Sequence, residues 1–108
     1  MDLANIQDAT ERFEVLQTSK RSQTAMMTLG PGAATGRKAK AHKKSDQVLL
    51  VLSGSLSGSV GAEKAQLRKG DVVLIRAGTP HRFQNDGRVR AVTFNVYSPP
   101  EYPPGRKG

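Results

Sequence analysis

The sequence predicts an all-β domain, a sandwich or barrel of short strands, and three observations support this fold class. Short apolar runs rich in β-branched residues recur at even spacing along the chain. Turn-forming segments separate them, and the 108 residues include 11 glycines and 6 prolines. No segment shows the periodicity of a long helix. Many short strands with frequent turns are typical of sandwiches and barrels.

The elements are expected in a simple order along the chain. Residues 3–10 are compatible with a short N-terminal helix. Strands are predicted at 13–17, 23–29, 37–43, 47–52, 55–60, 65–67, 72–76, 81–84 and 88–97. The tail 98–108, rich in Pro, Lys and Arg, is expected to be an extended C-terminal arm without a core of its own. We therefore interpret 1–108 as one domain whose core spans about 13–97.

The composition limits the compartment and the chemistry. The chain has no Cys, which excludes a disulfide framework and a thiolate metal site and is typical of a reducing cytoplasm. The N-terminal residues carry Asp and Glu and lack the apolar region of a secretory signal. The longest apolar run, 48–52, is far shorter than a membrane-spanning helix. We expect a cytoplasmic protein with no membrane partner.

The net charge of +8 raises the question of nucleic-acid binding. Most basic residues are spread along the chain, and only 37–44 forms a cluster. The three Phe and two Tyr do not interleave with basic residues, so no stacking platform for single strands is predicted. The sequence disfavours a nucleic-acid partner. Binding of nucleic acid or of an acidic partner through 37–44 is kept as the second alternative function.

Two predicted strands, Val48–Leu52 and Ala91–Val96, look apolar on both faces. A strand with one solvated face alternates apolar and polar residues. One face of each strand can fill the domain core, but the other must be covered. In so small a chain the cover that we predict is a second copy, which makes the protein a homodimer.

The two histidines, His42 and His81, are the only imidazoles, and each follows a turn at the start of a β-segment. Their similar placement predicts one shared site. If residues 37–43 form a strand, Lys40 and His42 point to the same side because they are two residues apart. Phe83 has the parity of His81 and is expected inside the barrel, as core or as a pocket wall.

Residues 36–85 resemble the cupin family, specifically small single-domain bacterial cupins of the RmlC-like jelly-roll type. The family's second motif is G-x5-P-x-G-x2-H-x3-N, and Gly70, Gly78, His81 and Asn85 match it in register. Only the Pro position differs, because Arg76 occupies it. The resemblance implies a double-stranded β-helix, a jelly-roll barrel.

The family's first motif, G-x5-H-x-H-x3,4-E-x6-G, is matched only in part. Gln47 stands at the Glu position with Gly54 at the correct distance, and His42 stands at the second His position. The first His position falls on Lys40. Metal-binding members of the family hold a divalent metal with three His and one Glu. The resemblance thus implies a metal set of His42, Gln47 and His81, from which a carboxylate and one imidazole are missing.

Two interpretations of this site follow from the resemblance. The first is a cupin barrel whose mouth binds a small, anionic ligand through Lys40, His42, Gln47, His81 and Phe83, or a weakly held Zn, Ni, Fe or Mn ion. The alternative is a metal-dependent cupin enzyme of isomerase or dioxygenase type. The incomplete ligand set weighs against an enzyme, and the question of catalysis stays open.

Overall fold

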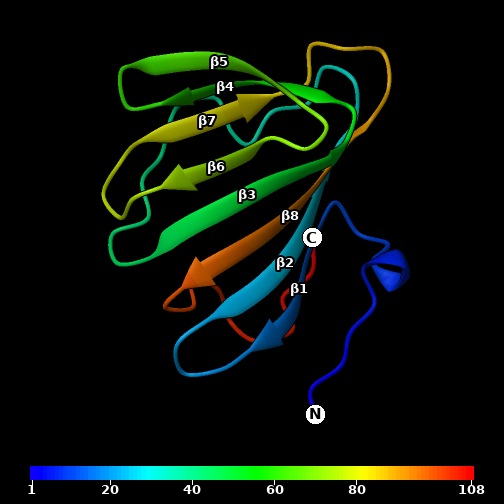
Figure 1. Cartoon of the computed structure of the whole chain (residues 1–108), viewed down its shortest axis with the longest axis vertical. Helices are drawn as coiled ribbons and strands as arrows, with labels where there is room; N and C mark the ends of the chain where they lie inside the picture. The colour runs from blue at the N-terminus through cyan, green and yellow to red at the C-terminus, as the bar shows by residue number, and fades with distance from the viewer.

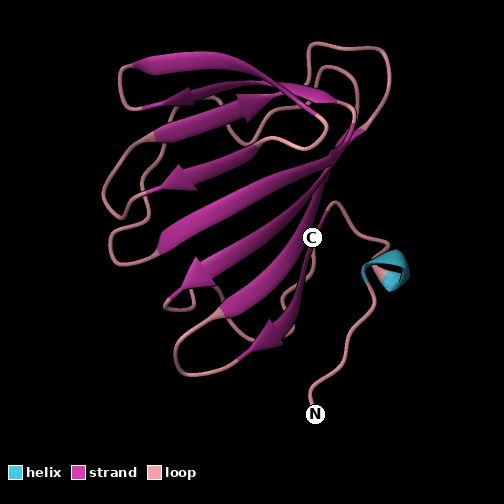
Figure 2. Cartoon of the chain, viewed as in Figure 1, coloured by secondary structure: helices cyan, strands magenta, loops and turns pink.

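A computed structural model describes all 108 residues and contains two antiparallel β-sheets. Figure 1 shows the three-stranded sheet above the five-stranded one, and Figure 2 shows that strands and loops make up nearly the whole chain. The larger sheet has the order β1-β2-β8-β3-β6, and the smaller has the order β5-β4-β7. The strands are β1 Phe13–Thr18, β2 Gln23–Leu29, β3 Asp46–Ser53, β4 Ser55–Val60, β5 Glu63–Arg68, β6 Val72–Ile75, β7 His81–Gln84 and β8 Ala91–Ser98. This architecture confirms the predicted all-β jelly-roll fold.

The main core lies between the two sheets. Leu49 and Val51 of β3 meet Leu56 of β4 and Phe83 of β7 there, and each of these four side chains is at most 1% exposed. Alternation along β3 places Leu49 and Val51 inward and their neighbours outward. Phe83 is buried as its parity predicts.

The inward face of β8 is more polar than its sequence suggests. Thr93 and Asn95 point inward and are almost completely buried, while Val92, Phe94 and Val96 lie on the outer face. The outer face of β3 is apolar as expected, because Val48, Leu50 and Leu52 alternate with the core residues. Polar side chains buried inside the barrel need hydrogen-bond partners. Asn95 has two, Thr93 and Gln47, and Gln47 is one of the predicted site residues.

Two predicted elements differ from the structure. The N-terminal helix is reduced to one 3-10 turn, η1 Ile6–Asp8, and no helix in the chain is long and apolar enough to cross a membrane. The predicted strand 37–43 does not form. The loop between β2 and β3 runs beside the free edge of β7 instead, where it forms the isolated bridges Ala34↔Gln84 and Lys40↔His81 and single hydrogen bonds such as that from the Thr35 amide to the Phe83 carbonyl at 2.9 Å. The segment therefore lacks the continuous ladder of a strand, although Lys40 and His42 both line the same cavity.

The C-terminal arm returns to the sheet. The amide of Val15 donates to the carbonyl of Arg106 at 2.8 Å, and the amide of Gly108 donates to the carbonyl of Phe13 at 2.8 Å. These bonds cover the exposed edge of β1. The arm therefore lies close to the end of the barrel that holds both histidines.

Gln23, 1% exposed, fastens the middle of the arm. Its Oε1 accepts the amides of Glu101 at 3.1 Å and Tyr102 at 3.0 Å, and its Nε2 donates to the Tyr102 carbonyl at 2.8 Å. Ser45 adds a hydrogen bond of 2.8 Å to the Pro99 carbonyl. A buried amide that satisfies three backbone groups of one segment fixes where that segment lies.

Candidate functional site

A cavity of about 280 Å³ opens at the end of the barrel where both histidines lie. Strands of both sheets, the loop before β3 and the C-terminal arm all contribute to its wall. The side chains that could bind a ligand are Arg12, Lys38, Lys40, His42, Gln47, His81, Tyr97, Tyr102 and Arg106. Phe13, Met27 and Phe83 supply most of the apolar wall. No Asp or Glu side chain lines the cavity.

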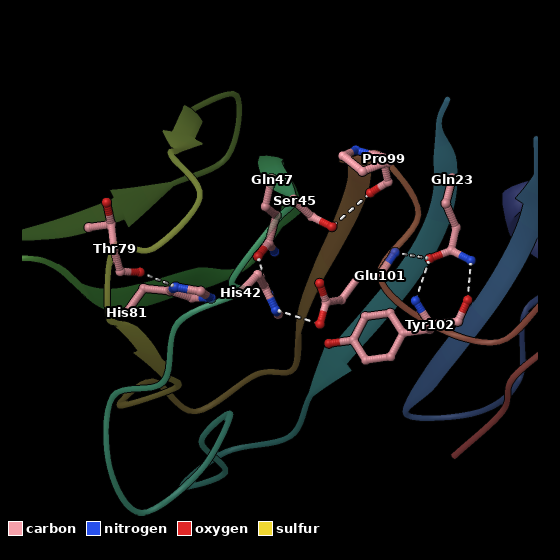
Figure 3. A network of polar contacts seen from close by, with 9 residues as sticks. All are labelled: Gln23, His42, Ser45, Gln47, Thr79, His81, Pro99, Glu101 and Tyr102. Carbon is pink, nitrogen blue, oxygen red and sulfur yellow. Dashed lines mark hydrogen bonds and ion pairs between the residues drawn. The ribbon is translucent and has the colours of Figure 1, made fainter. Parts of the chain in front are cut away.

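His42 lies at the centre of a polar network (Figure 3). Its Nε2 is 3.1 Å from Oε1 of Gln47, and its Nδ1 is 3.3 Å from Oε2 of Glu101. Its ring is 4.9 Å from that of His81, between centroids, and 5.5 Å from that of Tyr97 in an edge-on arrangement. Both nitrogens of His42 therefore already face protein oxygens.

His81 opens β7, and its backbone exchanges two hydrogen bonds with Lys40. Its Nδ1 lies 2.9 Å from the carbonyl of Thr79, an atom that only accepts, so the proton of the neutral ring is on Nδ1. Nε2 of His81 has no hydrogen-bond partner in the protein. Because no buried side-chain nitrogen or oxygen lacks a partner, Nε2 is not buried, and since His81 lines the cavity this atom is accessible from there. Burial lowers the pKa of His81 below its ordinary 6.5, the Thr79 bond opposes this, and the charge of His42 adds to it.

The other predicted site residues take different places. Gln47 is 4% exposed and lines the bottom of the cavity, where its Nε2 donates to Asn95 at 2.9 Å. Phe83 is both a core residue and a wall residue. Lys40 is exposed at the rim. The structure thus brings Lys40, His42, Gln47, His81 and Phe83 to one cavity; their function is a separate question.

Sequence reasoning missed the contribution of β8 and the C-terminal arm. Tyr97 and Tyr102 pack edge-on at 5.2 Å between ring centroids, and Arg106 lies over the Tyr102 ring at 5.2 Å. Burial raises the pKa of Tyr97 and of Tyr102, so both phenols stay neutral near neutral pH. The parity of Tyr97 with the buried Asn95 was the available signal for that residue. No sequence pattern indicates where the arm returns.

The metal set implied by the motif does not fit a divalent cation in this arrangement. Nε2 of His42 and Oε1 of Gln47 face each other rather than a common point between them and His81. No group of three or more His, Cys, Asp or Glu side chains gathers with metal-binding geometry. A metal bound by His42, Gln47 and His81 stays a prediction, and it requires His42 to release Gln47.

Comparison with known proteins places this geometry in a family. A family model described as a cupin domain matches residues 25–97. An uncharacterised protein of Streptomyces coelicolor is 38% identical over 69 residues, which cover 64% of this chain and 64% of that protein. The uncharacterised protein YrkC of Bacillus subtilis is 27% identical over 113 residues, which cover 95% of this chain and 60% of YrkC. The match thus spans less than two thirds of either relative.

Solved structures share the fold. A crystal structure from Bacillus halodurans superposes with a TM-score of 0.89 at 24% identity, covering 97% of this chain and 86% of that one. This likeness supports the jelly-roll architecture alone. The family model, however, spans well over half of the chain and contains both histidine-bearing segments. The chain is therefore a small cupin-barrel protein and belongs to the cupin domain family.

Proposed function

We propose that this protein binds a small organic anion, of the hydroxy-acid, sugar-acid or phosphate class, in the cavity at the barrel mouth. One observation carries the proposal. The cavity wall contains four Lys or Arg side chains and two His, and no acidic side chain. Clustered charge of one sign in a concave, low-dielectric site raises the local concentration of the opposite charge. Its volume of about 280 Å³ suits a small ligand.

The wall offers distinct partners for each part of such a ligand. Lys40 and Lys38 stand at the rim on long flexible stems and can approach a carboxylate or phosphate. Nε2 of His81 can accept a hydrogen bond from a ligand hydroxyl when the ring is neutral. Aromatic side chains, among them Phe83 and Tyr97, supply apolar contact for the carbon skeleton.

The two alternatives draw on fewer observations. A metal-dependent isomerase or dioxygenase is favoured only by the accessible Nε2 of His81, because His42 and Gln47 are engaged with each other. Binding of nucleic acid through 37–44 rests on exposed charge. Lys38 and Lys40 of that cluster line the cavity, so the same charges serve the small-anion proposal.

Thermal unfolding in the presence of citrate, a sugar acid or inorganic phosphate tests the proposal, with a neutral polyol as the ligand control. We expect at least one anion to raise the melting temperature, because a ligand at a hundredfold excess over its Kd stabilises by about 2.7 kcal/mol. Lys40→Met should reduce this shift. Lys69→Met, which removes an exposed lysine remote from the cavity wall, should leave it unchanged.

The opposite pattern would overturn the proposal. If no anion moves the melting temperature while Zn²⁺ or Ni²⁺ raises it, the metal-dependent alternative replaces small-anion binding. An equal loss of the anion shift in Lys40→Met and Lys69→Met would also count against the cavity, because it would indicate a general effect of surface charge.

A further inference from the structure

A chain of four hydrogen bonds connects His42 to the backbone inside the barrel. The hydroxyl of Thr93 donates to the carbonyl of Met27 at 3.0 Å, and Nδ2 of Asn95 donates to Oγ1 of Thr93 at 3.0 Å. Nε2 of Gln47 donates to Oδ1 of Asn95 at 2.9 Å. Oε1 of Gln47 then faces Nε2 of His42 at 3.1 Å.

The direction of this chain is fixed at its inner end. The Met27 carbonyl can only accept a hydrogen bond, so the Thr93 hydroxyl donates its single proton to it. The hydroxyl oxygen must therefore accept from Asn95. Asn95 therefore turns its NH₂ toward Thr93 and its oxygen toward Gln47. Gln47 in turn presents its oxygen to the imidazole. An amide oxygen cannot donate, so Nε2 of His42 must carry the proton.

The other nitrogen of His42 faces Glu101. The carboxylate lies 3.3 Å from Nδ1, and Glu101 is not among the residues that line the cavity. A carboxylate can only accept, so Nδ1 is the donor of this pair. The place of Glu101 is set by Gln23, which accepts the amides of Glu101 and Tyr102 and donates to the Tyr102 carbonyl (Figure 3). The arm is thus held so that Glu101 meets His42.

We propose that Glu101, supplied by the C-terminal arm, is a positioning residue of the cavity, and that Glu101 and Gln47 together hold His42 as a hydrogen-bond donor through both ring nitrogens rather than as a metal ligand. Gln47, at the position of the family's metal-binding Glu, then orients His42 instead of binding a metal. The buried hydrogen-bond chain fixes the orientation of the Gln47 amide, so that its oxygen faces the imidazole of His42. Nε2 of His81 is then the single imidazole nitrogen that is open to a ligand. This inference deepens the proposed site but does not depend on which ligand binds.

Long-range ¹⁵N–¹H spectra of the 108-residue protein, recorded without ligand, test the proposal. The chain has two histidines, so His81→Gln assigns the signals. We expect Nε2 of wild-type His42 to give the chemical shift of a protonated nitrogen. Glu101→Gln should move the Nδ1 signal and leave Nε2 protonated, and Glu101→Asp should restore Nδ1. Glu63→Gln, which removes an exposed carboxylate on β5, is the matched control and should change neither.

A second pair of variants tests the buried chain. Thr93→Val removes the hydroxyl that orients Asn95 and, through Asn95, Gln47, so we expect the Nε2 signal of His42 to move while the Nδ1 signal stays in place. Thr28→Val, on the opposite face of its sheet, should leave both signals unchanged. Addition of Zn²⁺ to the wild type should leave the protonated Nε2 signal of His42 in place.

Three results would overturn the proposal, and the wild-type spectrum alone can supply the first. They are an unprotonated Nε2 in the wild type, an Nδ1 signal indifferent to Glu101→Gln, and loss of the Nε2 proton on addition of Zn²⁺. Because the spectra need no anion, their failure and the failure of small-anion binding are separate results.

Discussion

The protonation of His81 depends on folding. Burial lowers its pKa in the folded protein, while the unfolded chain keeps the ordinary value of about 6.5. The unfolded state therefore binds more protons between the two values, and stability rises with pH there. His81 contributes fully above about pH 6.5, and its contribution is lost as the pH falls through the lowered pKa.

The first prediction is that His81→Gln flattens this part of the pH dependence. The difference in unfolding free energy between wild type and His81→Gln should shrink or reverse as the pH falls from 7.5 toward 5. Urea unfolding at several pH values measures it, and taking the difference removes the shared contribution of the other groups. A difference that is constant over this range would show that His81 is not the group responsible.

At position 47, the replacement of a carboxylate oxygen by an amide nitrogen separates a metal-binding site from a site that only orients His42. An amide holds His42 through a neutral oxygen, whereas a carboxylate at the same position would add the negative charge that a divalent cation prefers. We predict that Gln47→Glu raises the affinity for Zn²⁺ and Ni²⁺ by at least about tenfold, equivalent to about 1.4 kcal/mol. Adding Lys40→His should raise it further.

Competition titration with a metal indicator measures this gain. Gln66→Glu, at an exposed position of β5, adds the same charge away from the cavity and should have no effect. If Gln47→Glu binds metal no better than the wild type, position 47 is not a ligand position, despite its register in the motif.

At the scale of elements, the turns between strands decide how the two sheets meet. Gly54 joins β3 to β4 with a φ of +76°, and a Cβ there would lie 2.5 Å from the carbonyl oxygen of Arg90. Gly70 has a similar φ of +93° in the turn before β6, but a Cβ would meet nothing within 4 Å. The two glycines thus share a backbone constraint, while only Gly54 also has a steric one.

We predict that Gly70→Ala costs about 1 kcal/mol of unfolding free energy and that Gly54→Ala costs at least about twice as much. Each alanine must adopt a left-handed conformation, but at Gly54 the backbone around Arg90 must also move. Chemical denaturation of the two variants measures the difference. Equal costs would mean that the β8 backbone gives way easily beside Gly54.

At the scale of the whole molecule, the outer face of the larger sheet is apolar across four strands. Strand register aligns two rows of mostly apolar side chains on it: Met26, Phe94, Leu50 and Val72, then Thr24, Val96, Val48 and Leu74. Val72 is 64% exposed and Leu74 is 51% exposed. Contiguous apolar surface of this kind marks interaction sites, and a second copy can cover it by twofold symmetry.

We therefore predict a homodimer whose interface is this outer face. Light scattering should give the dimer mass for the wild type and the monomer mass for Leu74→Lys combined with Val72→Lys. Val89→Lys is the control, because Val89 is 66% exposed but lies in the loop between β7 and β8. A monomeric wild type at working concentration, or a dimer that survives the double substitution, would contradict this interface.

The sequence by itself determined most of the strands, the family and five of the fourteen residues that line the cavity. Alternation and turn chemistry are local properties, so β2, β4 and β7 were predicted at their observed limits. Motif register placed His42, Gln47 and His81 together because cupin barrels share strand spacing. The tertiary structure alone decided the partners of those residues. Glu101 is distant in sequence and on an arm without periodicity, and only the packing of that arm against Gln23 brings its carboxylate to His42.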